Sequence, residues 1–263
     1  MPEAEPFYNE NAPNEWERLE RHRTEMAVTL RAMQEYLPSA PCPILDIGGG
    51  PGRYSIELSA RGYQVTLYDL AQKNLDLALE KAAETGVELE RVVHGDARDL
   101  STLGDQQYAA VLLMGPLYHL LEKSDRKQAV RQAMEHLEPG GVLMAAFITR
   151  FAPFRHAAVE EPYWIHENQA YATEMLKNGI HDRAEQFAFA YFAHPEEINP
   201  FMESCGLTTL NLIGVEGLVA GHEGAVNKLQ GPAWEAWVEF NYLVGQQPSL
   251  HGASDHLLYI GRR

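Results

Sequence analysis

The sequence predicts an α/β protein built on a doubly wound, mostly parallel sheet. Strand-like and helix-like segments alternate five times between residues 44 and 149, which is the pattern of parallel strands joined by helices. Residues 108–114 are almost entirely apolar, as expected for a strand that is covered on both faces. A glycine-rich run at residues 48–52 follows the first strand and precedes a helix, a position at which such sheets bind ligands.

The N-terminal region precedes this alternating core. Residues 1–13 are polar and carry three prolines, and we interpret them as an arm. From Asn14 to Leu37, apolar residues recur at helical spacing, which predicts one amphipathic helix with Asn14 as its N-cap. The proline-rich residues 38–43 then form a linker.

The expected elements of the core follow from apolar runs and turn signals. Strands are predicted at residues 44–47, 64–68, 88–93, 108–114 and 142–149. Helices are predicted at residues 53–61, 72–85 and 123–137, with Gly86 ending the second of them.

The pattern changes after residue 150. Residues 151–193 are rich in aromatic residues and histidines but lack a strand period, so we expect a mostly helical insertion. The remainder, residues 194–263, predicts a helix at 196–205, a strand at 207–215, a helical segment at 222–245 and a last strand at 256–261.

Composition narrows the class of partner. The chain has 21 basic and 37 acidic residues, a net charge of −16, and this acidity opposes binding to nucleic-acid phosphates. The acidic start does not resemble a signal peptide, and the apolar runs are too short to span a membrane. We therefore expect a cytoplasmic protein with no nucleic-acid or membrane partner. The oligomeric state is not predicted.

No metal site is expected. The two cysteines, Cys42 and Cys205, match no ligand spacing, and the 11 histidines are scattered.

The glycine run Asp46-Ile-Gly-Gly-Gly-Pro-Gly52 departs from the dinucleotide-binding fingerprint. Gly48 and Gly50 fit that fingerprint, but Arg53 stands at its third glycine position, where a large side chain opposes close helix–strand packing. Asp46 would also repel a pyrophosphate. The loop therefore favours another ligand, although an NAD-dependent oxidoreductase is kept as an alternative.

Further candidate binding residues follow the next strands. Asp69 ends the second strand, where a carboxylate accepts hydrogen bonds from ribose hydroxyls, and Asp96 follows the third strand, where it can accept from an adenine amino group. Residues 114–119 leave the fourth strand at the same edge of the sheet. We expect these groups to converge on one ligand.

On these residues the sequence resembles the class I S-adenosylmethionine-dependent methyltransferases. The matching motifs are the glycine run at 46–52, Asp69, residues 95–97, Met114-Gly-Pro-Leu-Tyr-His119 and Glu138-Pro-Gly-Gly141. The resemblance implies a Rossmann-like, seven-stranded sheet whose last strand is antiparallel. It also implies four regions: an arm and lid helix at 1–43, a cofactor-binding core at 44–150, a cap insertion at 151–193, and the rest of the core sheet with a helical insertion at 194–263.

The resemblance assigns a cofactor, S-adenosylmethionine, whose demethylated product is S-adenosylhomocysteine. Gly48 and Gly50 would lie against its methionine part, and Asp46 would help to hold its amino group through the loop. Asp69 would bind the ribose, and Asp96 with Ala97 would contact the adenine. The full set of expected cofactor-binding residues is Tyr8, Arg23, Asp46, Gly48, Gly50, Asp69, Leu70, Asp96, Ala97 and Met114.

Arg23 interrupts the apolar face of the predicted lid helix. A buried guanidinium requires a partner, and we expect it to pair with the cofactor carboxylate while Tyr8 closes over the site. The alternatives are a salt bridge within the protein or an extended side chain lying past Trp16.

The acceptor side offers two catalytic candidates, Tyr118 and His119. His119 could take a proton near neutral pH, or it could be a packing histidine with a satisfied ring. The insertion holds a set of aromatic residues and histidines that suits a small, partly apolar acceptor: Phe151, Phe154, His156, Tyr163, Trp164, His166, Tyr171 and His181. The sequence thus predicts methyl transfer to a nitrogen or oxygen of a small molecule, with a non-catalytic cofactor-binding subunit as another alternative.

Overall fold

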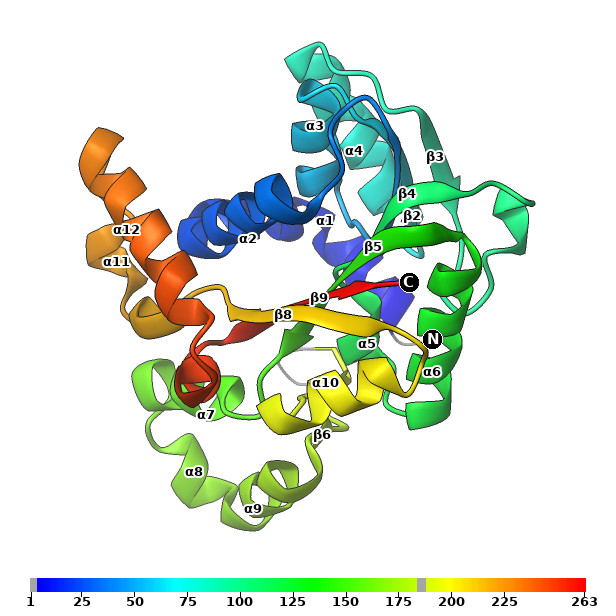
Figure 1. Cartoon of the computed structure of the whole chain (residues 1–263). Coiled ribbons are helices and arrows are strands. Elements are labelled where there is room, and N and C mark those ends of the chain that lie inside the picture. Colours follow the sequence, from blue (N-terminus) through cyan, green and yellow to red (C-terminus); the bar gives the residue numbers. More distant parts are fainter. Residues whose placement is uncertain (1–3, 184–187) are drawn as a thin grey trace.

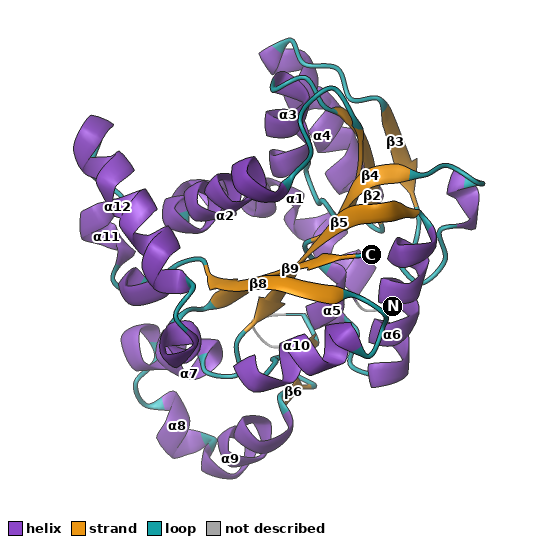
Figure 2. Ribbon diagram, viewed as in Figure 1, coloured by secondary structure: helices purple, strands orange, loops and turns teal. Residues whose placement is uncertain are grey.

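A seven-stranded sheet with helices on both faces forms the centre of the molecule (Figures 1 and 2). The computed structural model describes residues 4–183 and 188–263. The sheet has the order β3-β2-β1-β4-β5-β9-β8. Its strands are β1 (Pro43–Ile47), β2 (Gln64–Asp69), β3 (Arg91–His94), β4 (Tyr108–Leu113), β5 (Leu137–Ile148), β8 (Thr208–Gly214) and β9 (His256–Arg262).

Strand direction confirms the expected sheet. Strands β1 to β5 pair in parallel, whereas β9 is antiparallel to both β5 and β8. The strand order reverses at β1, because β2 lies on one side of it and β4 on the other. The loops that follow these strands therefore diverge at the carboxyl ends. Such a switch point leaves a crevice for a ligand.

Two layers of apolar side chains hold the helices on the sheet. Alternate residues of one strand enter opposite layers: Ile44 packs in one core cluster and Leu45 in the other. Side chains from three helices complete the first cluster: α2 (Arg23–Tyr36), α3 (Arg53–Ala60) and α12 (Gly231–Gly245). Those from α5 (Pro116–His119), α6 (Lys123–Glu135) and α10 (Pro195–Glu203) complete the second. This period of two explains why the central strands read as continuous apolar runs.

Apart from the short α5, which the sequence pattern does not predict, the helices of the core begin and end close to their predicted positions. They are α3 (Arg53–Ala60), α4 (Gln72–Thr85), α5 (Pro116–His119), α6 (Lys123–Glu135), α10 (Pro195–Glu203), α11 (Glu223–Val226) and α12 (Gly231–Gly245). The single helical segment expected at 222–245 is divided into α11 and α12. Gly231, with a φ of +56°, begins the second helix.

The N-terminal prediction is wrong in two respects. Helix α1 (Ala4–Arg21) already includes most of the expected arm and places Asn14 in a helix interior, while residues 1–3 lie outside the described residues. The helix then breaks at His22, which has φ −101° and ψ 55°, before α2 (Arg23–Tyr36) begins. Burial of Ala4 and Ala12 supplies the packing that overrides the poor helix propensity of this polar, proline-containing segment.

The insertion contains the expected helices and an unexpected ribbon. Helices α7 (Ala152–Glu160), α8 (Trp164–Glu167) and α9 (Gln169–Asn178) lie together at one end of the molecule (Figure 1). Strands β6 (Ile180–His181) and β7 (Ala190–Tyr191) pair in an antiparallel ribbon, which is too short to show a periodicity in the sequence. Part of the predicted insertion, residues 184–187, lies outside the described residues. Within the described ranges, none of the helices combines the length and the apolar composition that crossing a bilayer requires.

Candidate active site

The glycine loop forms the floor of a cavity at the carboxyl ends of β1, β2 and β4. Gly48, Gly49 and Gly50 all line it. Gly48 has a φ of +68°, and a Cβ there would lie 2.4 Å from the Cδ atom of Pro116. A side chain at this position would therefore be strained and would collide with the start of α5, so bare backbone faces the ligand.

Asp69 holds the loop in place from the end of β2. Its carboxylate accepts hydrogen bonds from the amides of Gly50 and Ala71, both at 2.8 Å. Burial raises the pKa of Asp69, against the opposing effect of these hydrogen bonds. Oδ1 also accepts a 3.3 Å hydrogen bond from Asn74, whereas Oδ2 has Gly50 as its donor. Asp69 lines the cavity, and Oδ2 keeps a second lone pair for a ribose hydroxyl.

Asp46 lies beneath the loop and not in the cavity wall. Its Oδ2 accepts a 2.6 Å hydrogen bond from Ser55, and burial raises its pKa to about 7. Its other oxygen, Oδ1, is buried without a hydrogen-bond partner within the described part of the chain. A cation bound against the loop would stabilise this carboxylate, so the site fits a sulfonium compound with an ammonium group better than it fits a pyrophosphate.

The structure does not place the side chain of Asp96 in this cavity. Leu70, Ala97 and Met114 line it as expected, but the Asp96 carboxylate is bound by Arg98, with a shortest distance of 2.6 Å. Despite partial burial, this arginine lowers the pKa of Asp96. The predicted contact between Asp96 and an adenine amino group therefore lacks the geometry that the other residues have.

The prediction for Arg23 is wrong. Its guanidinium donates to the carbonyl oxygens of Asn227 and Leu229, at 3.1 and 2.8 Å, and stacks 3.8 Å from the ring centre of Trp234. The break at His22 turns α2 so that Arg23 faces the α11–α12 region instead of the cavity. The arginines that do line the cavity are Arg18, on α1, and Arg53, at the start of α3.

Tyr8, which we expect to close over the site, lines the cavity. The Tyr8 hydroxyl lies 2.5 Å from Nε2 of His119, and both residues line the cavity with Tyr118. Nδ1 of His119 lies 3.1 Å from the carbonyl oxygen of Phe189. Both ring nitrogens thus have a polar contact. Of the two roles that the sequence allows for His119, general base or packing residue, this arrangement corresponds to the packing residue.

A second cavity of about 410 Å³ adjoins the first. The two share Tyr8, Glu15, Arg18 and Tyr118 in their walls, and the second lies beneath the insertion. Its apolar wall comes from Trp164, Tyr171, Met175 and Phe192 among others. This volume falls within the range of small-molecule sites.

The expected cap residues divide into two groups. His156, Trp164, Tyr171 and His181 line the second cavity, whereas Phe151, Phe154, Tyr163 and His166 do not. The prediction of an aromatic wall is thus met by half of the residues named for it.

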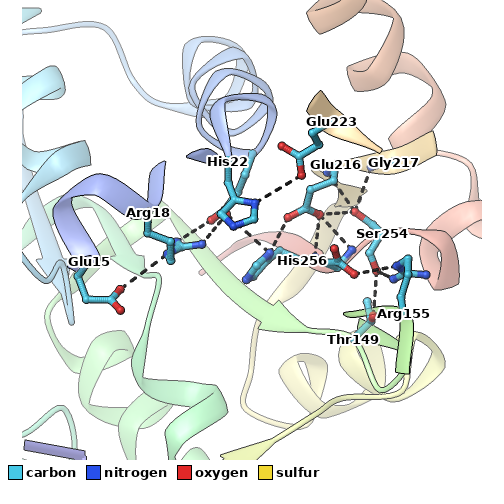
Figure 3. Close-up of polar contacts among 12 residues, drawn as sticks. Glu15, Arg18, His22, Thr149, Arg155, Glu216, Gly217, Glu223, Ser254 and His256 are labelled. Carbon is cyan, nitrogen blue, oxygen red and sulfur yellow. Dashed lines mark hydrogen bonds and ion pairs between the residues drawn. The ribbon is translucent and has the colours of Figure 1, made fainter. Parts of the chain in front are cut away.

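An ionic network that sequence reasoning missed supplies Arg18 and His256 to the wall of this cavity and holds them with two glutamates, Glu25 and Glu216 (Figure 3). Arg18 binds both oxygens of Glu25, at 2.6 and 2.9 Å. Nδ1 of His256 lies 2.5 Å from Glu216 and 3.7 Å from Glu25. Despite burial, Arg18 and His256 lower the pKa of Glu25 to about 2. Glu216 follows β8 and His256 begins β9. Their placement at the binding edge of the sheet is the sequence signal that could have identified this pair.

The glycine loop and Asp69 lie at a topological switch point, where doubly wound folds bind nucleotide-type ligands, and a second cavity adjoins the first. Known proteins identify the class of enzyme. Residues 44–141 match a family model described as a methyltransferase domain.

Two curated relatives are ubiquinone biosynthesis O-methyltransferases. The one from Methylobacterium nodulans is 30% identical over 68% of this chain and 65% of its own length. The one from Chromobacterium violaceum is 30% identical over 65% of this chain and 67% of its own length. The first match therefore leaves about a third of that relative uncovered.

Among solved structures, a protein from Thermotoga maritima described as a possible histamine N-methyltransferase has the same fold. It aligns with a TM-score of 0.60 and 20% identity over 97% of this chain and 98% of its own. The chain belongs to the class I S-adenosylmethionine-dependent methyltransferases.

Proposed function

We propose that this enzyme transfers the methyl group of S-adenosylmethionine to an oxygen or nitrogen of a small, partly aromatic molecule, leaving S-adenosylhomocysteine. The observation that carries the proposal is the common wall of the two cavities. Arg18 and Tyr118 face both of them, so a cofactor over the glycine loop and an acceptor beneath the insertion would meet there.

The chain's own residues supply alignment and exclusion of water. The cofactor supplies the activated methyl group, so the protein mainly has to hold the two reactants in line. Gly48, Gly50 and Asp69 would hold the cofactor, and Leu70, Ala97 and Met114 would contact it. Tyr8 would cover it from α1.

Oxygen is the favoured acceptor atom. The curated relatives are O-methyltransferases by name, and an aromatic wall built from Trp164 and Tyr171 suits a planar acceptor. The acidic surface, with a net charge of −16, disfavours a nucleic-acid acceptor. The predicted cytoplasmic location and the predicted boundaries of the four regions stay predictions.

Binding and turnover measurements test the proposal. We expect calorimetry to show binding of S-adenosylmethionine and S-adenosylhomocysteine but not of NAD. We also expect labelled methyl groups to appear on phenolic or related small molecules in a metabolite panel. Binding without turnover on any acceptor would instead support a non-catalytic subunit, and binding of NAD alone would refute the proposal.

A further inference from the structure

The polar wall of the second cavity contains a histidine whose two ring nitrogens have different surroundings. Nδ1 of His256 faces the carboxylates of Glu216 and Glu25, and His256 itself lines the cavity. We propose that His256 is a catalytic residue that binds the acceptor oxygen as an anion, and that Glu216 is its positioning residue. This rests on the proposed function and narrows the acceptor to a planar molecule with an acidic hydroxyl group.

Sheet topology brings His256 to the reacting edge. Strand β9 is antiparallel to β5, so its first residue lies where the parallel strands end, and His256 is paired with Ile148. Ile148 is the last residue of β5 and also lines the second cavity. Because β9 is antiparallel to its neighbours β5 and β8, the start of this strand, and not its end, lies at the binding edge.

Several hydrogen bonds hold the carboxylate of Glu216, and this carboxylate in turn fixes the orientation of the His256 ring. Its Oε2 accepts hydrogen bonds from the Ser254 hydroxyl and from the amides of Asp255 and His256, at 2.7, 3.1 and 2.8 Å. Figure 3 shows Glu216, Ser254 and His256 joined by these contacts. Glu216 is buried, with 1% of its surface exposed, and, despite that burial, His256 lowers its pKa. A carboxylate in this setting stays ionised and orients the ring through Nδ1–H.

The other ring nitrogen is available to a ligand. Within residues 4–183 and 188–263, no hydrogen-bond partner is found for Nε2 of His256, and this atom is not among the buried polar atoms that lack a partner. Because His256 lines the cavity and its Nδ1 faces the glutamates, Nε2 is the ring nitrogen through which it can bind an acceptor.

The charges around His256 favour its protonated form. Glu25 on α2 and Glu216 after β8 face it, Asp255 precedes it, and Arg18 on α1 lies behind Glu25. Although burial opposes protonation, the two glutamates raise the pKa of His256 to about 9. At neutral pH the ring therefore presents Nε2–H as a cationic donor, which binds an oxyanion more strongly than a neutral donor does.

A metal ion is the other ligand that this cluster suggests, and the contacts disfavour it. Ligand atoms of Glu25, Glu216 and His256 lie within 4.8 Å of one another. Both Glu25 oxygens already accept from Arg18, and Glu216 Oε2 has three donors. A divalent ion would have to displace these bonds and remove the proton from Nδ1.

The resulting reaction is balanced. The acceptor hydroxyl loses its proton to solvent when it binds opposite the imidazolium. The oxygen lone pair then forms the bond to the methyl carbon while the carbon–sulfur bond breaks, with its electron pair kept by sulfur. The products are a neutral methyl ether and S-adenosylhomocysteine, and His256 keeps its proton throughout. A proton-bearing His256 thus acts by stabilising the acceptor anion rather than by general-base catalysis.

A chromophoric phenol tests this directly. 4-Nitrophenol is titrated into the protein saturated with S-adenosylhomocysteine, and absorbance reports the phenolate fraction of the bound probe. We expect the wild type to lower the apparent pKa of the bound probe by at least one unit, a tenfold change in its ionisation. The His256→Gln variant is expected to lose this shift, and Glu216→Gln to reduce it. His166→Gln, an exposed histidine of the insertion outside the cavity wall, is the matched control and is expected to retain it.

The outcomes separate this inference from the proposed function. If the wild-type protein does not bind S-adenosylhomocysteine, the proposed function is refuted. Intact cofactor binding with an equal shift in wild type and His256→Gln would overturn the role of His256. The role of His256 would also be overturned if the wild type binds 4-nitrophenol only in its neutral form, or does not bind it at millimolar concentration. If His256→Gln does not fold, as judged by circular dichroism, the comparison of Glu216→Gln with the wild type decides the question by the same criterion.

Discussion

The hydroxyl of Tyr8 donates a 2.5 Å hydrogen bond to Nε2 of His119 and so connects the N-terminal helix α1 to the end of α5, the short helix after β4. A carbonyl oxygen can only accept, so the contact between Nδ1 and Phe189 places the proton on Nδ1 and leaves Nε2 as the acceptor. Burial lowers the pKa of His119 to about 4. The ring is therefore neutral at pH 7, and one proton arrangement satisfies both contacts.

The Tyr8→Phe variant is expected to bind S-adenosylmethionine more weakly. The variant removes the donor to a buried nitrogen, so the closed position of α1 over the cavity would be less stable by about 1 to 2 kcal/mol. This loss corresponds to roughly a 5- to 30-fold rise in Kd. Calorimetry measures the change. Tyr163→Phe, at a cap residue with 76% of its surface exposed, is the control. An unchanged Kd would show that α1 does not close over the cofactor.

Asp69→Ala is expected to weaken cofactor binding by about 1 to 3 kcal/mol. The variant removes the acceptor for ribose hydroxyls and also releases the amide of Gly50 from its 2.8 Å hydrogen bond, so an unpaired group is left in the site. Asp76→Ala, on the exposed face of α4, should leave the Kd unchanged. Equal affinities for the two variants would remove Asp69 from the site.

The cofactor half of the site was predictable because its signals are local. Gly48, Gly50 and Asp69 follow strands that are recognisable from apolar runs, and the parallel sheet rule then places them at one edge. Asp96 satisfies the same rule, but Arg98, two residues later, takes its carboxylate. A rule that places a residue at an edge does not predict which partner its side chain finds.

The N-terminal half of the lid was not predictable from periodicity. Arg23 lies on the apolar stripe only if residues 14–37 form one straight helix, and the break at His22 rotates everything after it. At the break, His22 contacts a residue far away in the sequence, with 3.5 Å between its Nδ1 and the carboxylate of Glu223, and such a contact leaves no local pattern. The Glu216–His256 pair is equally non-local, and it forms only once β8 and β9 are paired.

The corrected position of Arg23 gives a negative prediction. Arg23→Ala is expected to change the Kd for S-adenosylmethionine by less than twofold, because its guanidinium contacts Asn227, Leu229 and Trp234 instead of the cavity. The free energy of unfolding should fall by about 1 to 2 kcal/mol, since two carbonyl contacts and a stacked ring are lost. Calorimetry and urea unfolding measure the two effects. A tenfold loss of affinity with unchanged stability would restore the clamp that the sequence suggested.

Arg18 is expected to matter for stability as well as for binding. Arg18→Met leaves Glu25 buried, with 8% of its side chain exposed, and without its bidentate partner. Breaking such a pair destabilises strongly, and because the Arg18 side chain is 28% exposed we expect a loss of about 2 to 3 kcal/mol in urea unfolding. The double variant Arg18→Met, Glu25→Gln should recover part of this loss. Arg21→Met, one turn away and 57% exposed, is expected to cost less than about 0.5 kcal/mol.

The neutral His119 gives a prediction for acid stability. Its pKa in the folded protein is about 4, against an ordinary value of 6.5, so between these values the unfolded chain binds a proton that the folded protein does not. The contribution of His119 is therefore fully present above pH 6.5 and is lost as the pH falls towards 4, with a limiting slope of about 1.4 kcal/mol per pH unit.

Comparison with His119→Gln isolates this contribution from the many carboxyl groups that titrate in the same range. Urea unfolding at pH 7 and pH 5 gives the free energy of unfolding of both proteins, and the wild type should lose more of it than the variant on acidification. His166→Gln should follow the wild type, because this exposed ring does not contribute a buried neutral imidazole. Equal losses for wild type and His119→Gln would mean that His119 titrates normally, and that the Tyr8 hydroxyl does not depend on its neutral form.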